Sequence, residues 1–199
     1  MKWIGLVVGL ILGVSVFAFG AGLFGQPYTY HGSALDPAQP APDFSLTDQH
    51  NQPFRLSDQK DKVVLVFFGY TSCPDVCPTT LSDFKRVRAQ LGNQADQVEF
   101  VFITVDPKRD TPERILAFMQ VFDPAIVGLT GSDAQLQPVM KAYGVYAQEQ
   151  PGASAENYLV DHTARVYAID RQGRLRLTYT FGTPFEDLLQ DVQHLVKEG

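Results

Sequence analysis

Two cysteines separated by three residues are the side chains of this sequence best suited to chemistry. Cys73 and Cys77 are the only cysteines in the 199 residues, which excludes a zinc ribbon, an iron–sulfur ferredoxin and a disulfide-dense scaffold. Thiolates are nucleophiles and ligands for soft metal ions, so the pair predicts metal binding or thiol–disulfide exchange. The structural alternative is a permanent disulfide, although so short a loop gains little stability on the entropic model.

A soft cation held by two thiolates usually takes a third ligand. The candidates are His31, His50, His162, His194, Met119 and Met140. His162 stands out because it follows Tyr158-Leu159-Val160-Asp161, where a loop is predicted to meet the edge of a sheet. We expect the other three histidines to be solvated and the two methionines to fill the core. Asp161 is a candidate to orient the His162 imidazole, and its alternative reading is a turn residue at the end of a strand.

The segments around the cysteines predict how the pair is positioned. Residues 63–68 form an apolar run rich in β-branched and aromatic residues, which is typical of a strand buried on both faces. Pro78 suits the first turn of a helix, and Leu81, Phe84, Val87 and Leu91 recur at helical spacing. A helix N-terminus lowers a thiol pKa. A cysteine pair between a buried strand and its helix is typical of a thioredoxin-like fold.

The remaining segments predict an α/β fold with a mixed central sheet flanked by helices. The predicted elements are an N-terminal β-hairpin (44–47 and 53–56), strands at 98–105, 126–129, 162–170 and 175–181, and helices starting after Thr111, at 132–143 and at 185–195. Pro138 falls inside the second of these helices, so we expect a late start or a kink there. In the loop after the second buried strand, Arg109 or Asp110 is predicted to brace the cysteine loop.

The N-terminal segment predicts a membrane anchor. Residues 3–24 carry no charge, and a helix of 22 residues spans about 33 Å, enough for a bilayer core of about 30 Å. Lys2 favours a cytoplasmic N-terminus, so we expect a single-pass plasma-membrane protein with an extracytoplasmic domain. A cleaved signal peptide is the alternative. The predicted boundaries are anchor 1–25, linker 26–42 and domain 43–199. The net charge of −6 argues against nucleic-acid binding.

Three motifs together resemble the Sco/SenC family. They are residues 73–78 (CPDVCP), residues 105–113 (VDPKRDTPE) and residues 158–163 (YLVDHT). The resemblance implies a membrane-tethered, thioredoxin-like domain that binds copper and helps to assemble the copper-A centre of cytochrome c oxidase. It implies Cys73, Cys77 and His162 as the ligands. It also implies two partners, namely the copper-A-bearing oxidase subunit and an upstream copper donor protein.

Two thiolates and an imidazole suit copper better than magnesium or calcium. Two thiolates leave a Cu(I) site at net −1 and a Cu(II) site neutral, so both oxidation states fit. The first interpretation is a metallochaperone rather than an enzyme with turnover. The alternative is a thiol–disulfide oxidoreductase that keeps the copper-ligating cysteines of the oxidase subunit reduced. A peroxiredoxin-type peroxidase is disfavoured, since no Pro-x-x-x-Thr-x-x-Cys pattern precedes Cys73.

Overall fold

The computed structural model describes residues 28–154 and 157–198. The chain divides into two units, residues 1–30 and residues 31–199. The predicted anchor, residues 1–25, lies outside the described residues. Among the residues that are described, no helix is both long and apolar enough to span a bilayer.

The second unit is built on an eight-stranded mixed sheet with the order β1-β10-β9-β4-β5-β6-β2-β3. Its strands are β1 (Ser33–Pro40), β2 (Ser45–Asp48), β3 (Pro53–Arg55), β4 (Val63–Gly69), β5 (Val98–Thr104), β6 (Val127–Thr130), β9 (Arg165–Ile169) and β10 (Arg174–Thr180). Strands β4, β5 and β6 run parallel, and β9 and β2 flank them antiparallel. The predicted α/β fold with a mixed sheet and an N-terminal hairpin, β2–β3, is confirmed.

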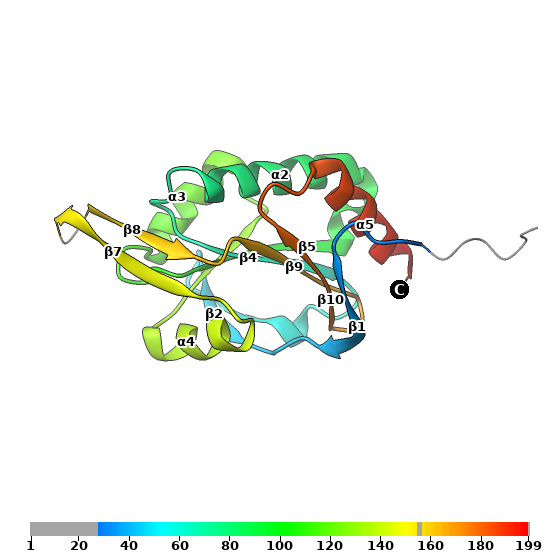
Figure 1. Ribbon diagram of the computed structural model, residues 1–199, viewed down its shortest axis with the longest axis horizontal. Coiled ribbons are helices and arrows are strands. Elements are labelled where there is room, and N and C mark those ends of the chain that lie inside the picture. The colour runs from blue at the N-terminus through cyan, green and yellow to red at the C-terminus, as the bar shows by residue number, and fades with distance from the viewer. Residues whose placement is uncertain (1–27, 155–156, 199) are drawn as a thin grey trace, which may run out of the picture. The chain divides into compact units, whose positions relative to one another are not determined.

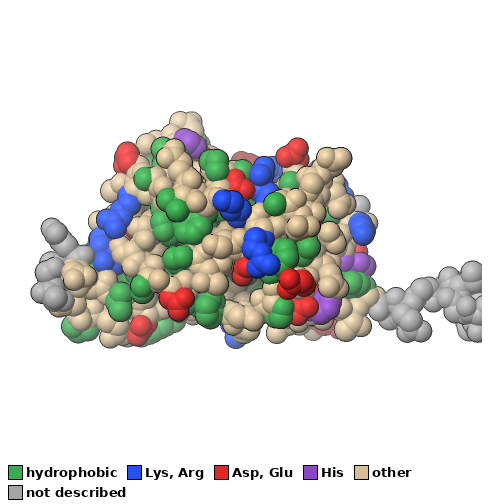
Figure 2. Space-filling view, turned by 90° about the horizontal axis from the view of Figure 1, so that it is seen from above, with side chains coloured by type: hydrophobic (Ala, Val, Ile, Leu, Met, Phe, Trp, Pro, Cys, Tyr) green, Lys and Arg blue, Asp and Glu red, His purple; other side chains and the backbone are tan. Residues whose placement is uncertain are grey.

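Within the described residues, four α-helices cover the sheet. They are α2 (Val76–Leu91), α3 (Pro112–Phe122), α4 (Asp133–Ala142) and α5 (Phe185–Glu198), and two short 3-10 helices, η1 (Leu56–Asp58) and η2 (Gly92–Gln97), complete the set. Helices α2, α3 and α5 lie on one face of the sheet and α4 lies on the other (Figure 1). On the face covered by α2, α3 and α5, acidic and basic side chains are interspersed rather than gathered by sign (Figure 2).

The core follows the apolar pattern of the sequence. Every residue of β4 is buried, as the apolar run predicts for a central strand between two helical layers. The four apolar residues at helical spacing in α2 are buried as well. Helix α3 begins as predicted, with Pro112 in its first turn and the Arg114 N–H donating to the Thr111 hydroxyl at 3.3 Å.

Helix α4 departs from its prediction. A late start caused by Pro138 is wrong, because α4 begins at Asp133 and Pro138 lies inside it. The reason is the cap: Ser132 precedes the helix, and its N–H donates to the Gln135 side-chain oxygen at 3.0 Å. The proline removes one hydrogen bond from the helix, and the capped first turn holds despite that loss.

The predicted linker, residues 26–42, also needs correction. Residues 33–40 form β1, which pairs antiparallel with β10 at the edge of the sheet, so the folded domain starts ahead of residue 43. The segment has no apolar alternation, and its burial is slight. It still pairs because an edge strand tolerates prolines whose missing N–H faces away from the ladder, and the register shifts between Ala34 and Gln39.

A second, two-stranded sheet was not predicted. Strands β7 (Ala147–Ser154) and β8 (Asn157–His162) pair antiparallel and form a sheet separate from the main one. They project beyond the main sheet as a hairpin (Figure 1). The predicted strand 162–170 is therefore wrong at its start, because β8 ends at His162 and β9 begins at Arg165.

His31 is exposed, as predicted for a solvated histidine, but it also contacts the folded domain. Its ring Nδ1 lies 3.0 Å from Asp191 Oδ1. Asp191 is fully buried and also accepts hydrogen bonds from the N–H groups of His31 and Gly32 and from the Tyr179 hydroxyl. The hydrogen bond to Asp191 raises the pKa of His31 above 6.5, against the smaller opposing effect of desolvation.

The raised pKa makes this contact pH-dependent. Because the folded-state pKa of His31 exceeds the unfolded value, the protonated contact contributes fully below the unfolded pKa and is lost as the pH rises through the folded pKa. The thermal midpoint of the wild-type chain should exceed that of His31→Gln by more at about pH 6 than at about pH 9. Thermal unfolding followed by circular dichroism at both pH values tests this. An equal difference at the two pH values would contradict it.

Candidate metal centre

Three elements bring the predicted ligands together. Cys73 lies in the loop after β4, Cys77 in the first turn of α2, and His162 at the end of β8. The Cys77 sulfur lies 3.7 Å from His162 Nε2. One ligand atom from each of the three residues lies within 4.8 Å of the others. Segments 85 residues apart in the chain thus converge on one point.

The geometry and chemistry of these atoms fit a soft metal ion. Metal bonds of about 2.0–2.3 Å to nitrogen and sulfur, as measured for zinc, place neighbouring ligand atoms about 3.5–4 Å apart around a shared ion. The 3.7 Å separation of Cys77 Sγ and His162 Nε2 meets that requirement. Cys77 is fully buried, Cys73 is 9% exposed and His162 is half-buried. Solvent therefore reaches the site mainly at His162.

The two cysteines have different protonation behaviour. The pKa of Cys73 is lowered to about 3, first by a hydrogen bond from the Cys77 thiol, and further by His162 and by the backbone N–H groups of Asp75 and Cys77. The Cys77 N–H lies 3.5 Å from Cys73 Sγ, at the N-terminus of α2. The pKa of Cys77 is raised, because it donates to Cys73 and because it is buried. Without metal, the pair holds one thiolate and one thiol.

Of the two residues predicted to brace the cysteine loop, Arg109 and Asp110, it is Asp110 that does so. Its buried carboxylate accepts hydrogen bonds from the Thr71 N–H at 3.0 Å, the Thr71 hydroxyl at 2.6 Å and the Thr104 hydroxyl at 2.6 Å. Burial raises the pKa of Asp110 and these hydrogen bonds oppose the rise. Arg114 adds hydrogen bonds to the hydroxyls of Thr71 and Ser72. The loop that carries Cys73 is therefore tied to the segment after β5.

Two aromatic rings pack against the imidazole of His162. The ring of Phe67 lies edge-on at 6.1 Å between centroids, and the ring of Tyr70 at 5.7 Å. Both rings come from β4 or the residue after it, so the strand that leads to the cysteines also supports the third ligand. Sequence reasoning gave Tyr70 no role; its only signal was its place in the cysteine loop.

Asp161 does not face the imidazole. It accepts a hydrogen bond from Gln150 Nε2 at 2.6 Å across the hairpin, and neighbouring residues of a strand point to opposite faces. The imidazole Nδ1 instead lies 3.3 Å from the backbone oxygen of Thr163. The partner of Nδ1 is thus the backbone of Thr163. The sequence could not predict this contact, because every residue carries a backbone oxygen whatever its side chain.

The other candidate ligands lie elsewhere. His50 is exposed in the turn between β2 and β3, and His194 contacts Glu198 within α5. Met119 and Met140 are buried under their helices, as predicted. Among the described residues, only the Cys73, Cys77 and His162 group brings three potential metal-binding side chains of the His, Cys, Asp or Glu type together.

Gly69 leaves room for the Cys77 sulfur. A Cβ atom at this position would lie 2.7 Å from Cys77 Sγ and 2.9 Å from the rings of Phe67 and Phe102. Gly69→Ala should therefore displace Cys77 Sγ, lower copper affinity about 10-fold and destabilise the domain by about 1–3 kcal/mol. Gly128→Ala is the matched control, because its Cβ would clash with Ile115 in the core. That control should lose stability and keep copper affinity; equal losses of affinity in both variants would argue against the prediction.

The fold and the site define a class: a thioredoxin-like domain with a Cys-Cys-His group suited to a soft metal ion. The family model described as SCO1/SenC matches residues 33–197, and the chain belongs to this family. A "SCO2-like protein" of Rickettsia felis is 37% identical over 146 residues, which cover 72% of this chain and 71% of the relative.

Solved structures of the family share the fold. The structure of Bradyrhizobium japonicum ScoI with copper bound matches with a TM-score of 0.73 and 39% identity, covering 78% of this chain and 98% of the other. The solution structure of apo Sco1 from Thermus thermophilus matches with a TM-score of 0.76 and 38% identity, covering 86% of this chain and 99% of the other. The resemblance inferred from the three motifs is confirmed.

Proposed function

We propose that this chain is a copper metallochaperone for the assembly of the copper-A centre of cytochrome c oxidase. The observation that carries the proposal is the convergence of Cys73, Cys77 and His162 within 4.8 Å. Two thiolates and one imidazole form a donor set for copper. Membership of the SCO1/SenC family and a relative solved with copper bound support the same conclusion.

The site suits a protein that passes its metal on. Three protein ligands leave room for a fourth, and His162 is half-exposed while Cys73 beside it is 9% exposed. A thiolate of a recipient protein can then bind the ion before the three ligands have all dissociated. The copper-A-bearing subunit of the oxidase is the proposed recipient, and an upstream copper donor protein is the proposed source.

A thiol–disulfide oxidoreductase is the second candidate function. The observation in its favour is the pairing of a Cys73 thiolate with a buried Cys77 thiol. A thiolate attacks a disulfide, and a neighbouring thiol then resolves the mixed disulfide. Electrons would pass from the cysteine pair to a disulfide formed by the copper-ligating cysteines of the oxidase subunit.

His162→Ala separates the two functions. The reduced, copper-loaded full-length chain is incubated with a metal-free oxidase subunit whose cysteines are reduced, and copper is measured in each protein. Wild type should transfer copper, and His162→Ala should bind and transfer much less. In a second assay the cysteines of the oxidase subunit are first oxidised to a disulfide, and reduced, copper-free wild type and His162→Ala should both reduce it. Failure of the wild type to transfer copper, together with reduction by both proteins, would favour the oxidoreductase.

We also propose that residues 1–25 anchor the domain in the plasma membrane, with the copper site on the extracytoplasmic side. The proposal rests on the 22 uncharged residues from Trp3 to Phe24. The full-length chain should remain in membranes after a high-salt or carbonate wash, and a chain lacking residues 1–25 should not. Release of the full-length chain by the wash would contradict the anchor.

A further inference from the structure

Strand β8 carries His162, but the main sheet does not hold it. Among the strands of residues 28–154 and 157–198, β8 pairs only with β7, in a sheet separate from the one that contains β4, the strand before the cysteine loop. The imidazole Nδ1 contacts the backbone oxygen of Thr163, the next residue in the chain, so this contact does not tie His162 to the main sheet. The distance from His162 to the cysteines therefore depends on whatever holds the backbone of β8 against the main domain.

Two side chains of the main domain hold the edge of β8 that faces away from β7. The Val160 N–H donates to the Tyr70 hydroxyl at 3.2 Å, and Arg109 Nη1 donates to the Tyr158 backbone oxygen at 2.9 Å. These backbone groups are two residues apart, so they point to the same edge of an extended strand. Tyr70 and Arg109 thus take the place of a neighbouring strand and hold β8 against the rest of the domain.

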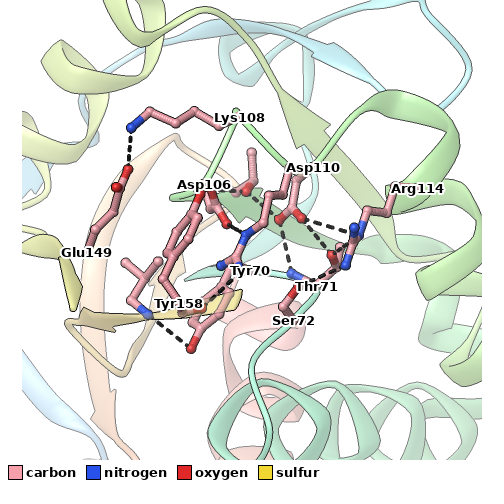
Figure 3. A network of polar contacts seen from close by, with 12 residues as sticks. Tyr70, Thr71, Ser72, Asp106, Lys108, Asp110, Arg114, Glu149 and Tyr158 are labelled. Carbon is pink, nitrogen blue, oxygen red and sulfur yellow. Dashed lines mark hydrogen bonds and ion pairs between the residues drawn. The ribbon is translucent and has the colours of Figure 1, made fainter. Parts of the chain in front are cut away.

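Arg109 is itself held in place. Its Nε donates to Asp106 Oδ2 at 2.5 Å, and its guanidinium lies 3.6 Å from the centre of the Tyr158 ring. The Tyr158 hydroxyl donates to Asp106 Oδ1 at 2.7 Å, so each of the three residues contacts the other two. Figure 3 shows Asp106 and Tyr158 facing each other in this network. Asp106 is 3% exposed, so these contacts lie away from the screening of solvent.

We infer that Asp106, Arg109 and Tyr158 form a clamp that positions His162 for copper. The clamp contacts β8 at Tyr158. Residues 158, 160 and 162 share one face of the strand, so holding Tyr158 also orients His162. Tyr70 links the two ends, since it binds the Val160 N–H and packs on the His162 ring. The inference rests on the proposed function, because it assumes that His162 binds copper. It assigns the VDPKRDTPE motif a second role beyond the contact of Asp110 with the cysteine loop.

Opening the clamp should convert a three-ligand site into a two-thiolate site. Loss of an outer contact of this kind lowers metal affinity about 10–100-fold. Arg109→Met alone leaves the buried Asp106 carboxylate without its cation and can therefore unfold the domain. The double variant Asp106→Asn/Arg109→Met removes both charges, so its copper affinity can be measured in a folded domain. Tyr158→Phe, which keeps the ring and loses the hydroxyl, should have a smaller effect in the same direction.

Lys108→Met is the matched control. Lys108 lies beside Arg109 in the sequence and pairs with Glu149 on β7 at 2.5 Å, but both side chains are about half-exposed (Figure 3). Exposed ion pairs contribute little, so this variant should bind copper as the wild type does. It changes one cation of the same loop without touching the clamp.

The experiment titrates Cu(II) into the reduced full-length chain and records thiolate-to-copper charge-transfer absorption and nitrogen hyperfine splitting in electron paramagnetic resonance. The double variant should bind about 10–100-fold more weakly, and its spectra should shift toward those of His162→Ala. Spectra and affinity equal to the wild type in the folded double variant would overturn the clamp. If His162→Ala itself leaves both readouts unchanged, the ligand set of the proposed function is wrong, and the clamp with it.

Discussion

Cys77→Ser is expected to abolish copper binding at the site while leaving the domain folded. Serine has nearly the same shape, and its hydroxyl can donate to Cys73 Sγ, which the Cys77 thiol does in the wild type. A hydroxyl is a hard, neutral ligand, so the soft ion loses one of its two thiolates. Copper affinity should fall by about 1,000-fold or more, a loss of about 4 kcal/mol.

Competitive titration of Cu(I) against a chelator of known affinity measures this loss. Cys73→Ser should give a similar loss, since both sulfurs lie in the three-residue group. Circular dichroism controls for folding in both variants. Retention of wild-type affinity by either folded variant would show that copper binds elsewhere on the chain.

Asp110→Ala is expected to destabilise the domain and loosen the cysteine loop. Asp110 is fully buried and accepts hydrogen bonds from Thr71 and Thr104. Its removal leaves the buried Thr104 hydroxyl and the part-buried Thr71 donors without this acceptor, at about 1–3 kcal/mol for each donor that finds no other partner. The free energy of unfolding should fall by about 3 kcal/mol, which lowers the thermal midpoint by about 6–12 °C in a domain of this size.

Asp110→Asn is the matched control for that variant. The amide oxygen still accepts from the Thr71 N–H and the Thr104 hydroxyl, and the amide nitrogen can donate to the Thr71 hydroxyl, which has a free lone pair. The loss should be about 1 kcal/mol, with copper affinity close to the wild type. Equal losses of stability for Ala and Asn would show that charge, rather than hydrogen-bond geometry, makes Asp110 important.

The parts of the fold that could be predicted are those with a strong local signal. The apolar run of β4 and the helical spacing in α2 reflect burial on two faces and on one face. The start of α3 follows from Thr111 and Pro112, whose backbone preferences are local. The position of the cysteine pair follows from these elements, because it lies in the loop between β4 and α2.

The parts that could not be predicted depend on contacts between distant segments. Strand β1 is polar and rich in proline, and it exists because β10 offers a free edge. Strand β8 offers only Leu159, which is exposed, and Val160, which is buried, as aliphatic residues, so no apolar alternation marks the hairpin. The backbone of β8 is also bound by Tyr70 and Arg109, residues far away in the sequence.

The site shows the same division. The cysteine pair stood out by type and spacing alone, whereas His162 was one of several candidates until the three motifs were considered together. The roles of Arg109 and Tyr158 rest on a cation–π contact and a backbone hydrogen bond across 49 residues. No pattern within either segment encodes such a contact, so it appears only in the folded chain.

X-ray absorption at the copper edge of the full-length chain, loaded with one equivalent of Cu(I), tests the central claim most directly. The account predicts a first shell of two sulfur atoms and one imidazole nitrogen, and a shell that keeps both sulfurs but loses this nitrogen in His162→Ala. A wild-type shell without two sulfurs, or a shell that His162→Ala leaves unchanged, would contradict the assignment of Cys73, Cys77 and His162 as the copper ligands.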